Sequence, residues 1–230
     1  MVKKRLIFTL QYCDDNFMLS RNFRLQKAGN IRWLEKNYNF KKIAHCIDEL
    51  IILNVNKSDK KVDIFAQDLK KIVRDIFVPI AVGGGIRSLE DAKLYMHSGA
   101  DKLILNSALF ENPNLIESLI KIYGKQCIIA SVDFKRSDSS LDVYIHNGET
   151  KIEMNLHEYM AYLENLNVGE IYLNSIDRDG TGFGYDVEVL KEVSKNISSP
   201  VIAAGGAGFD SHLIEAINID RIDAVATANL

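Results

Sequence analysis

A short phrase in the first half of the chain returns, slightly altered, about 121 residues later. Pro79–Gly85 reads Pro-Ile-Ala-Val-Gly-Gly-Gly, and Pro200–Gly206 reads Pro-Val-Ile-Ala-Ala-Gly-Gly. Three polar positions repeat at offsets of 121 or 122 residues: Gln11 with Asp133, Glu49 with Glu170, and Asp101 with Asp223. Self-similarity on this scale indicates that the chain is built from two equivalent halves.

Short β-branched segments alternate with amphipathic segments from one end to the other. Eight are predicted as strands: Arg5–Gln11, Glu49–Val55, Val78–Val82, Lys102–Asn106, Cys127–Asp133, Glu170–Ser175, Val201–Ala204 and Ala224–Ala228. Helical periodicity is clear at Val62–Ile76, Leu89–His97, Pro113–Tyr123, Leu156–Leu166 and Val187–Asn196. Such alternation favours a parallel sheet, and eight strands can close into a (βα)₈ (TIM) barrel. An open doubly wound sheet is the alternative, but a twofold repeat favours a barrel of two (βα)₄ halves.

Length supports a single α/β domain covering residues 1–230. The last predicted strand is followed directly by Leu230, so we expect a barrel that lacks the eighth helix. Two segments after strands are long and polar, Tyr12–Ile31 and Asp138–Asn155, and the second contains a hairpin-like stretch at His146–Glu149. Long loops at the carboxyl ends of barrel strands are where ligands usually bind.

Composition excludes several classes of partner. A net charge of −3 predicts neither a nucleic-acid nor a membrane partner. No apolar run approaches a membrane span, and the start of the chain lacks a signal-peptide cleavage site, so we expect a cytoplasmic protein. The three cysteines fit neither a disulfide framework nor a zinc spacing, and the five histidines are scattered. We therefore expect no metal site and no cofactor.

Two glycine clusters follow predicted strands. Gly84 and Gly85 belong to the first, and Gly205 and Gly206 to the second. Glycine lets the backbone approach an anion closely, so each cluster predicts a phosphate site, whereas a plain tight turn is the alternative. The strands that come next end in polar or small residues that would complete these sites: Asn106, Ser107, Ala228 and Asn229. Two such sites at one barrel mouth predict a ligand with a phosphate at each end.

Carboxylates also stand after two strands. Asp133 ends the fifth predicted strand and is the candidate general acid or base, with loop capping as the alternative. Asp179, followed by Gly180, comes after the sixth strand and is a second candidate at the same mouth.

Several motifs along the chain match one known family, in order and over the whole length. They are Val82–Arg87, Gly99–Lys102, Asn106–Ser107, Gln126–Cys127, Asp133–Arg136, Ser175–Thr181, Gly184–Asp186 and Ala204–Gly208. In these motifs the chain resembles the cyclase subunit of imidazole glycerol phosphate synthase, the half of a glutamine amidotransferase that uses ammonia. The resemblance implies that a glutaminase docks at the N-terminal face of the barrel. It also implies that a bisphosphorylated nucleotide is split and cyclised at the opposite face.

The resemblance is incomplete at the catalytic end. The family uses one aspartate at the end of strand one and another at the end of strand five; here Asp133 is present but Gln11 takes the first position. Leu19 stands where the family has a substrate-contacting lysine, and Asn54 where it has an aspartate. An amide has no proton to exchange near neutral pH, and general acid–base catalysis contributes roughly 10²–10⁴ in rate.

At the other end the resemblance is complete. The family controls ammonia entry with four charged residues, and this chain has all of them: Arg5, Glu49, Lys102 and Glu170. A structural layer of ion pairs is the alternative role. The combination is similar to a branch of the family associated with surface-sugar amidation, in which a separate synthetase turns an acetamido sugar into an acetamidino sugar.

Three functions therefore stay open. The first is an ammonia-conducting subunit for sugar amidation, partnered by a glutaminase and a downstream amidation enzyme. The second is a working cyclase of histidine biosynthesis, in which Asp133 acts alone or with Asp14 or Asp15. The third is a non-catalytic allosteric activator of the glutaminase.

Overall fold

The computed structural model describes residues 3–37, 45–57, 60–74, 76–138 and 140–228. Eight parallel strands form one continuous sheet in the order β10-β11-β12-β1-β4-β5-β6-β7, and β7 also pairs with β10. The sheet is therefore a closed barrel, as predicted, and not an open doubly wound sheet. Its strands are β1 (Arg5–Cys13), β4 (Glu49–Asn54), β5 (Ile80–Gly83), β6 (Lys102–Leu105), β7 (Ile128–Arg136), β10 (Glu170–Ser175), β11 (Val201–Ala204) and β12 (Ile222–Thr227).

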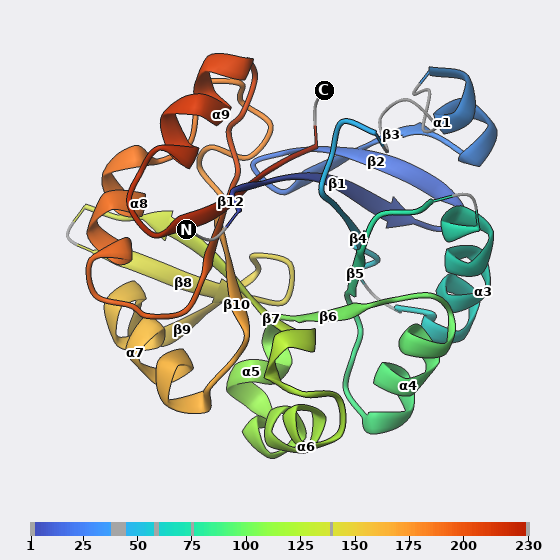
Figure 1. The fold of residues 1–230 in the computed structure, drawn as a ribbon, viewed down its shortest axis with the longest axis horizontal. Helices are drawn as coiled ribbons and strands as arrows, with labels where there is room; N and C mark the ends of the chain where they lie inside the picture. Colours follow the sequence, from blue (N-terminus) through green and yellow to red (C-terminus); the bar gives the residue numbers. More distant parts are fainter. Residues whose placement is uncertain (1–2, 38–44, 58–59, 75, 139, 229–230) are drawn as a thin grey trace.

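Helices surround the barrel (Figure 1). They are α1 (Ile31–Asn37), α3 (Val62–Val73), α4 (Leu89–His97), α5 (Ser107–Glu111), α6 (Pro113–Tyr123), α7 (Leu156–Leu166), α8 (Val187–Ser194) and α9 (Asp210–Ile217). Two of them, α5 and α6, follow β6, and within the described part of the chain no helix follows β12. In the same part, no helix is both long enough and apolar enough to cross a bilayer.

Three helices begin and end at the predicted residues because local capping defines both boundaries. Ser88 and Asp91 form the capping box of α4, in which each side chain accepts from the other residue's backbone N–H. The Asn112 side chain caps α6, Pro113 opens it, and Gly124 ends it. The predicted helices that begin at Val62 and Val187 are three and two residues shorter than expected.

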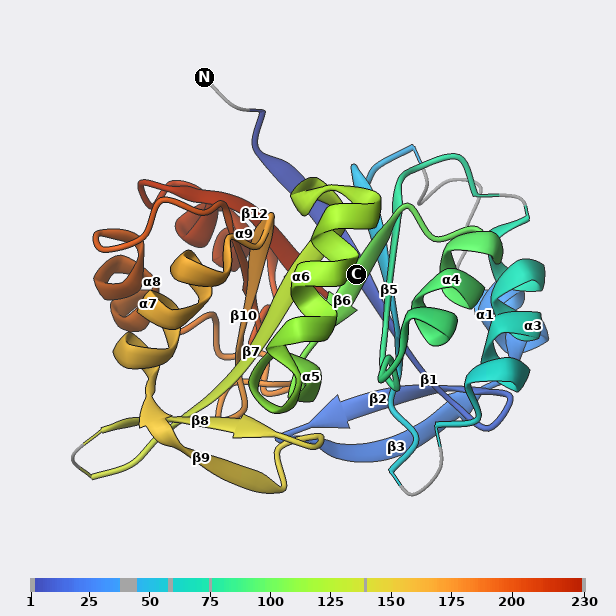
Figure 2. The ribbon, with the colours of Figure 1, turned by 90° about the horizontal axis from the view of Figure 1, so that it is seen from below.

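The two long polar segments are β-hairpins. β2 (Asn16–Arg21) and β3 (Arg24–Gly29) continue from β1, while β8 (Leu141–Ile145) and β9 (Thr150–Asn155) continue from β7. Pairing with these hairpins carries β1 to Cys13 and β7 to Arg136, beyond the predicted ends at Gln11 and Asp133. Figure 2 shows both hairpins at the same end of the barrel, opposite the N-terminus.

Side chains alternate between the two faces of each barrel strand. On β1, Phe8 and Leu10 join the outer core under the helices, whereas Ile7 packs inside the barrel. The inner core consists of small or β-branched residues with one tyrosine: Ile7, Ile51, Ala81, Ile104, Ile129, Tyr172, Ile202, Ala204, Ala224 and Ala226. This apolar plug separates the polar groups at the two ends of the barrel.

Candidate functional site

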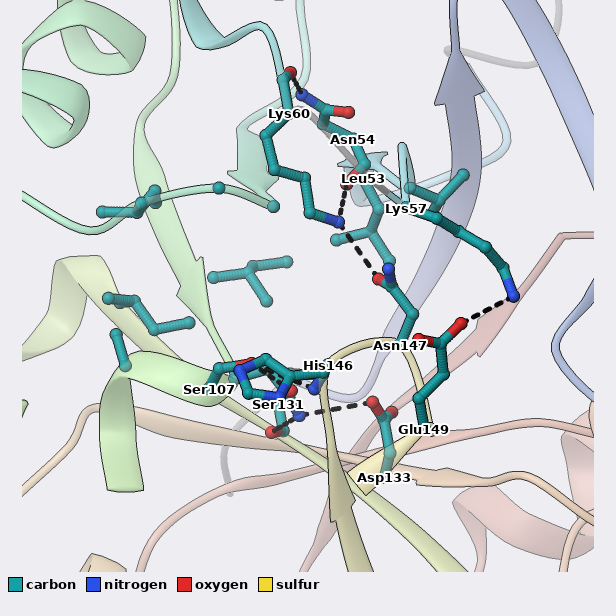
Figure 3. A pocket seen from close by; sticks show the side chains of 18 of the residues that line it. Leu53, Asn54, Lys57, Lys60, Ser107, Ser131, Asp133, His146, Asn147 and Glu149 are labelled. Atoms are coloured by element: carbon teal, nitrogen blue, oxygen red, sulfur yellow. Dashed lines mark hydrogen bonds and ion pairs between the residues drawn. The ribbon is translucent and has the colours of Figure 1, made fainter. Parts of the chain in front are cut away.

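A cavity of about 580 Å³ opens at the hairpin end of the barrel. We call it the mouth pocket. It brings together six of the predicted site residues: Gln11, Gly84, Gly85, Asn106, Ser107 and Asp133. Its wall is completed by residues of the β4–α3 loop and of the β8–β9 turn, some of which Figure 3 shows as sticks.

Asp133 is a buried carboxylate of the mouth pocket. It lies on the inner face of β7, is 7% exposed, and accepts hydrogen bonds from Asn174 Nδ2 and Asn106 Nδ2, both at 3.2 Å. Burial raises the pKa of Asp133 to about 7; the Asn174 hydrogen bond opposes this rise, and the nearby Asp179 carboxylate adds to it. A carboxyl group with a pKa near 7 can take up and release protons at neutral pH.

Gln11 lies at the corresponding height on β1. Its Oε1 atom is buried, and no hydrogen-bond donor among the described residues reaches it. A buried carbonyl oxygen without a donor is unfavourable by about 1–3 kcal/mol, unless a ligand or water supplies one. Gln11 is therefore suited to accept a hydrogen bond from a ligand, although its amide cannot exchange a proton.

The first glycine turn, Gly84–Gly85, needs its glycines. Both have left-handed backbones, with φ of 95° and 86°, and a Cβ atom on Gly84 would lie 2.1 Å from the carbonyl oxygen of Asn54. The Asn54 side chain in turn donates to the main-chain oxygen of Lys60. An ionised aspartate at position 54 could not make that bond, which gives a physical reason for the asparagine.

The second glycine turn, Gly205–Gly206, is not part of the mouth pocket. Its predicted companions Asp179, Gly180 and Ala228 are also absent from the pocket wall, and Asn229 lies outside the described residues. The structure thus brings together the first predicted phosphate site with Asp133 and Gln11, but does not join the two predicted phosphate sites in one cavity.

Asp179 instead anchors the β2–β3 hairpin. Its carboxylate accepts hydrogen bonds from Ser20 Oγ and from the backbone N–H of Phe23, and it is 9% exposed. The Asn22 N–H donates to the Asp179 main-chain oxygen at 2.9 Å. At Gly180 a Cβ atom would lie 1.8 Å from the Ser20 oxygen, so only glycine permits this close approach.

Sequence reasoning missed the basic side of the mouth pocket. Lys57, Lys60 and Arg87 line it, together with His146 and Asn147 of the β8–β9 turn. Lys57 pairs with Glu149 at 2.9 Å and Lys60 Nζ donates to Asn147 Oδ1 at 3.1 Å, so both lysines join the β4–α3 loop to that turn. The hairpin signal at His146–Glu149 was visible in the sequence, but its contact with a loop about 90 residues earlier was not.

The opposite end of the barrel carries the predicted charged ring of Arg5, Glu49, Lys102 and Glu170. Arg5 bridges both glutamates, and Lys102 Nζ lies 3.0 Å from Glu49 Oε2 and 2.6 Å from Glu170 Oε1. Burial raises the pKa of Glu49 in spite of Lys102. Burial acts in the same sense on Glu170, but its hydrogen bonds to Arg5 and Lys102 prevail and hold its pKa below the usual value. All four predicted residues thus form one ion-pair network.

A closed (βα)₈ barrel with a carboxylate and a glycine turn at the carboxyl ends of its strands defines a TIM-barrel protein with its ligand pocket at the C-terminal face. Residues 25–230 match the family described as Histidine biosynthesis protein. The chain belongs to this family, as a cyclase subunit of the imidazole glycerol phosphate synthase (HisF) type.

Curated relatives align along the whole chain. It is 46% identical over 230 residues to a protein of Parasynechococcus marenigrum provisionally named imidazole glycerol phosphate synthase subunit hisF2, covering 86% of that protein. It is 40% identical over 233 residues to imidazole glycerol phosphate synthase subunit HisF of Lachnoclostridium phytofermentans, covering 89% of it. It is 36% identical over 231 residues to subunit HisF of Dehalococcoides mccartyi strain BAV1, covering 90% of it.

The charged ring leads to a prediction about stability. Lys102→Met should lower the free energy of unfolding by about 3 kcal/mol, because two buried carboxylates would lose a shared cation. The double variant Lys102→Met/Glu49→Gln should recover part of the loss. Urea denaturation measures both, with Lys57→Met as the control, because its ion pair with Glu149 is more than half exposed and should contribute less than about 1 kcal/mol. If Lys102→Met and Lys57→Met lowered the free energy of unfolding equally, the charged ring would stabilise the fold no more than an exposed ion pair does.

Asp133 leads to a prediction about pH. Its pKa is raised above the unfolded value, so its protonated form favours folding; that contribution is complete below about pH 4 and is lost as pH rises through about 7. Carbon-13 NMR of the carboxyl groups should show one aspartate titrating near pH 7, and this signal should vanish in Asp133→Asn. An Asp133 signal that titrates near pH 4 would contradict the burial argument.

Proposed function

We propose that the chain is the ammonia-using subunit of a glutamine amidotransferase. A separate glutaminase docks at the N-terminal face of the barrel, and ammonia passes the charged ring and the barrel interior to the mouth pocket. The observation that carries this proposal is the contrast between the two ends: the four-residue ring is complete, whereas Gln11 replaces a carboxylate at the mouth.

The interior supports transfer of a neutral molecule. Between the ring and Asp133 the inner core is mostly apolar and includes the small residues Ala81, Ala224 and Ala226, with the buried hydroxyl of Thr9 as a polar exception. A buried apolar path disfavours ammonium strongly and neutral ammonia only weakly, because the cost of burial falls mainly on charge. The ring can hold a cation through Glu49 Oε1, which is buried and has no partner among the described residues.

In this proposal the final acceptor of the ammonia is an acetamido sugar of a surface-sugar pathway. A downstream synthetase activates the amide oxygen of an acetamido sugar with a nucleoside triphosphate, and ammonia replaces that oxygen to give an acetamidino sugar. Gln11 supports this assignment, since a cyclase reaction needs two proton-exchanging carboxyl groups. Beside Asp133, the mouth pocket is lined by Glu149 and Glu111, and these are held in ion pairs with Lys57 and His146. Asp14 and Asp15 do not line the pocket; Asp14 pairs with Lys61, and Asp15 accepts from the Tyr12 hydroxyl.

The second candidate function is a working cyclase of histidine biosynthesis. It is favoured by the names of the three relatives described above, each of which is named as an imidazole glycerol phosphate synthase subunit, and by the pKa of Asp133 near 7. In that case Asp133 would carry every proton transfer, and Gln11 would bind the substrate through its free carbonyl oxygen.

One steady-state assay distinguishes the two candidate functions. With a glutaminase partner, glutamine and the bisphosphorylated histidine-pathway intermediate, we expect the chain to stimulate glutamine hydrolysis. We expect imidazole glycerol phosphate to form roughly 10²–10⁴ times more slowly than in a cyclase with both aspartates, the usual range for a lost general acid or base. Gln11→Asp should raise product formation at least about tenfold, whereas Gln67→Asp, on the exposed face of α3, should not.

Fast product formation by the unaltered chain would overturn the sugar-amidation assignment and establish the cyclase. Absence of any stimulation of glutamine hydrolysis would overturn the docking of a glutaminase. Stimulation without transfer of ammonia to the histidine-pathway intermediate, or to an acetamido sugar in a second assay that adds the synthetase, would identify a purely allosteric activator.

A further inference from the structure

Buried oxygen atoms without a hydrogen-bond partner occur along the inside of the barrel. In the described part of the chain, five buried polar side-chain atoms lack a partner, and three of these belong to β1 and β4: Thr9 Oγ1, Gln11 Oε1 and Glu49 Oε1. Glu49 belongs to the charged ring and Gln11 to the mouth pocket. Each such atom is unfavourable by about 1–3 kcal/mol, so this set indicates a ligand that supplies hydrogen bonds.

Thr9 lies in the barrel interior between the two ends. Its neighbours Phe8 and Leu10 belong to the outer core, so the alternation of side chains turns Thr9 inward, on the same face as Ile7 and Gln11. Thr9 is 4% exposed. Two residues of a strand span about 6–7 Å, so the Thr9 hydroxyl lies one such step below Gln11 and the mouth pocket.

The Tyr172 side chain faces Thr9 from β10. Tyr172 belongs both to the inner core and to the wall of the mouth pocket. Burial raises the pKa of the Tyr172 hydroxyl, and the Thr9 hydroxyl acts in the opposite sense, as a neighbouring hydrogen-bonding group does. Nevertheless, Thr9 Oγ1 has no direct partner among the described residues. Two facing hydroxyls without a direct hydrogen bond leave a position for one small bridging molecule.

The hydrogen-bonding capacity of these groups matches neutral ammonia. The hydroxyls of Thr9 and Tyr172 can both donate and accept, whereas Gln11 Oε1 only accepts. Ammonia has three N–H donors and one lone pair, so one hydroxyl can donate to the nitrogen while the other oxygens accept. Ammonium has no lone pair to accept a hydroxyl proton, and the surrounding apolar side chains disfavour its charge.

We propose that Thr9 and Tyr172 form a binding station that holds one molecule of neutral ammonia below the mouth pocket. Tyr172 is in register with Ser131, two residues before Asp133 on β7, so the station lies one step below the buried carboxylate. The inference rests on the proposed function and deepens it by naming two residues that bind the ammonia before it enters the mouth pocket. Water can make the same hydrogen bonds, so the experiment must distinguish the two molecules.

Methyl NMR of the isolated chain, titrated with ammonium chloride, tests the station. The isoleucine δ1 methyl groups are labelled with carbon-13; Ile51 is in register with Thr9, and Ile202 with Tyr172. At pH 9, where neutral ammonia is abundant, we expect saturable shifts of both signals. The same total concentration at pH 6, or potassium chloride at pH 9, should give much smaller shifts. The signal of Ile122, which is 57% exposed, serves as the internal reference.

Variants that remove one hydroxyl measure the contribution of each residue. We expect Thr9→Val and Tyr172→Phe each to weaken ammonia binding about 3- to 10-fold, the effect of losing one hydrogen bond. Tyr123→Phe, which removes a hydroxyl from α6 outside the barrel, is the matched control and should leave the affinity unchanged. Thr9→Ser keeps the hydroxyl and should retain the affinity within about twofold, and circular dichroism of every variant checks the fold.

Saturable shifts that weaken in Thr9→Val and Tyr172→Phe but not in Tyr123→Phe would support the station. No saturable shift in the unaltered chain would overturn it and would assign the position to water. Unchanged affinity in both hydroxyl variants would also overturn it. The titration uses neither a glutaminase nor an acceptor, so its failure would leave the docking of a glutaminase intact. Conversely, an absence of stimulated glutamine hydrolysis would overturn that docking without affecting the station.

Discussion

Pairing between β7 and β10 closes the barrel, and the rest of the structure depends on that closure. In a closed barrel every second side chain of each strand must point inward. One strand, β1, therefore contributes Arg5 to the charged ring and Gln11 to the mouth pocket, with Ile7 and the buried Thr9 between them. The inner core lies between the two ends, and the same strands carry residues of both.

The polar groups at the two ends of the barrel differ in how completely they are paired. In the ring, two cations and two carboxylates are combined into one network, and only one oxygen of Glu49 lacks a partner in the described structure. At the mouth, among the residues that the structure describes, no donor reaches the Gln11 carbonyl oxygen and no carboxylate forms an ion pair with Lys60, and Asp133 has a raised pKa. Buried groups left in this condition are costly to a folded chain, and they concentrate where ligands bind.

Local signals explain how much of the fold could be predicted. Helices α4 and α6 were bounded correctly because Ser88, Pro113 and Gly124 act within a few residues of the helix ends. The hairpin β2–β3 was predicted only as a polar loop, since Gln26 and its partner Leu19 become recognisable as strand residues only through pairing. Periodicity identifies buried faces, and among the residues of β2 and β3 only Phe17 is buried.

Part of the candidate site could also be predicted, because some of its residues have a local signal in the sequence. Asp133 and the first glycine turn stand at strand ends, which the alternation of elements locates along the sequence. Lys60 was missed because its significance arises from what surrounds it: the loss of water, the neighbouring Arg87, and an asparagine from the β8–β9 turn. None of these is visible within a window of sequence around the lysine.

The two hairpins cross over to opposite parts of the barrel. The β2–β3 hairpin follows β1, the first barrel strand, and hydrogen-bonds to Asp179, which follows β10. The β8–β9 hairpin follows β7, the fifth barrel strand, and its turn contacts Lys57 and Lys60, which follow β4. A chain cut between α6 and β7 would give two fragments, each with a hairpin that contacts the other fragment. The hairpin contacts at the mouth of the barrel would therefore help to hold the two fragments together.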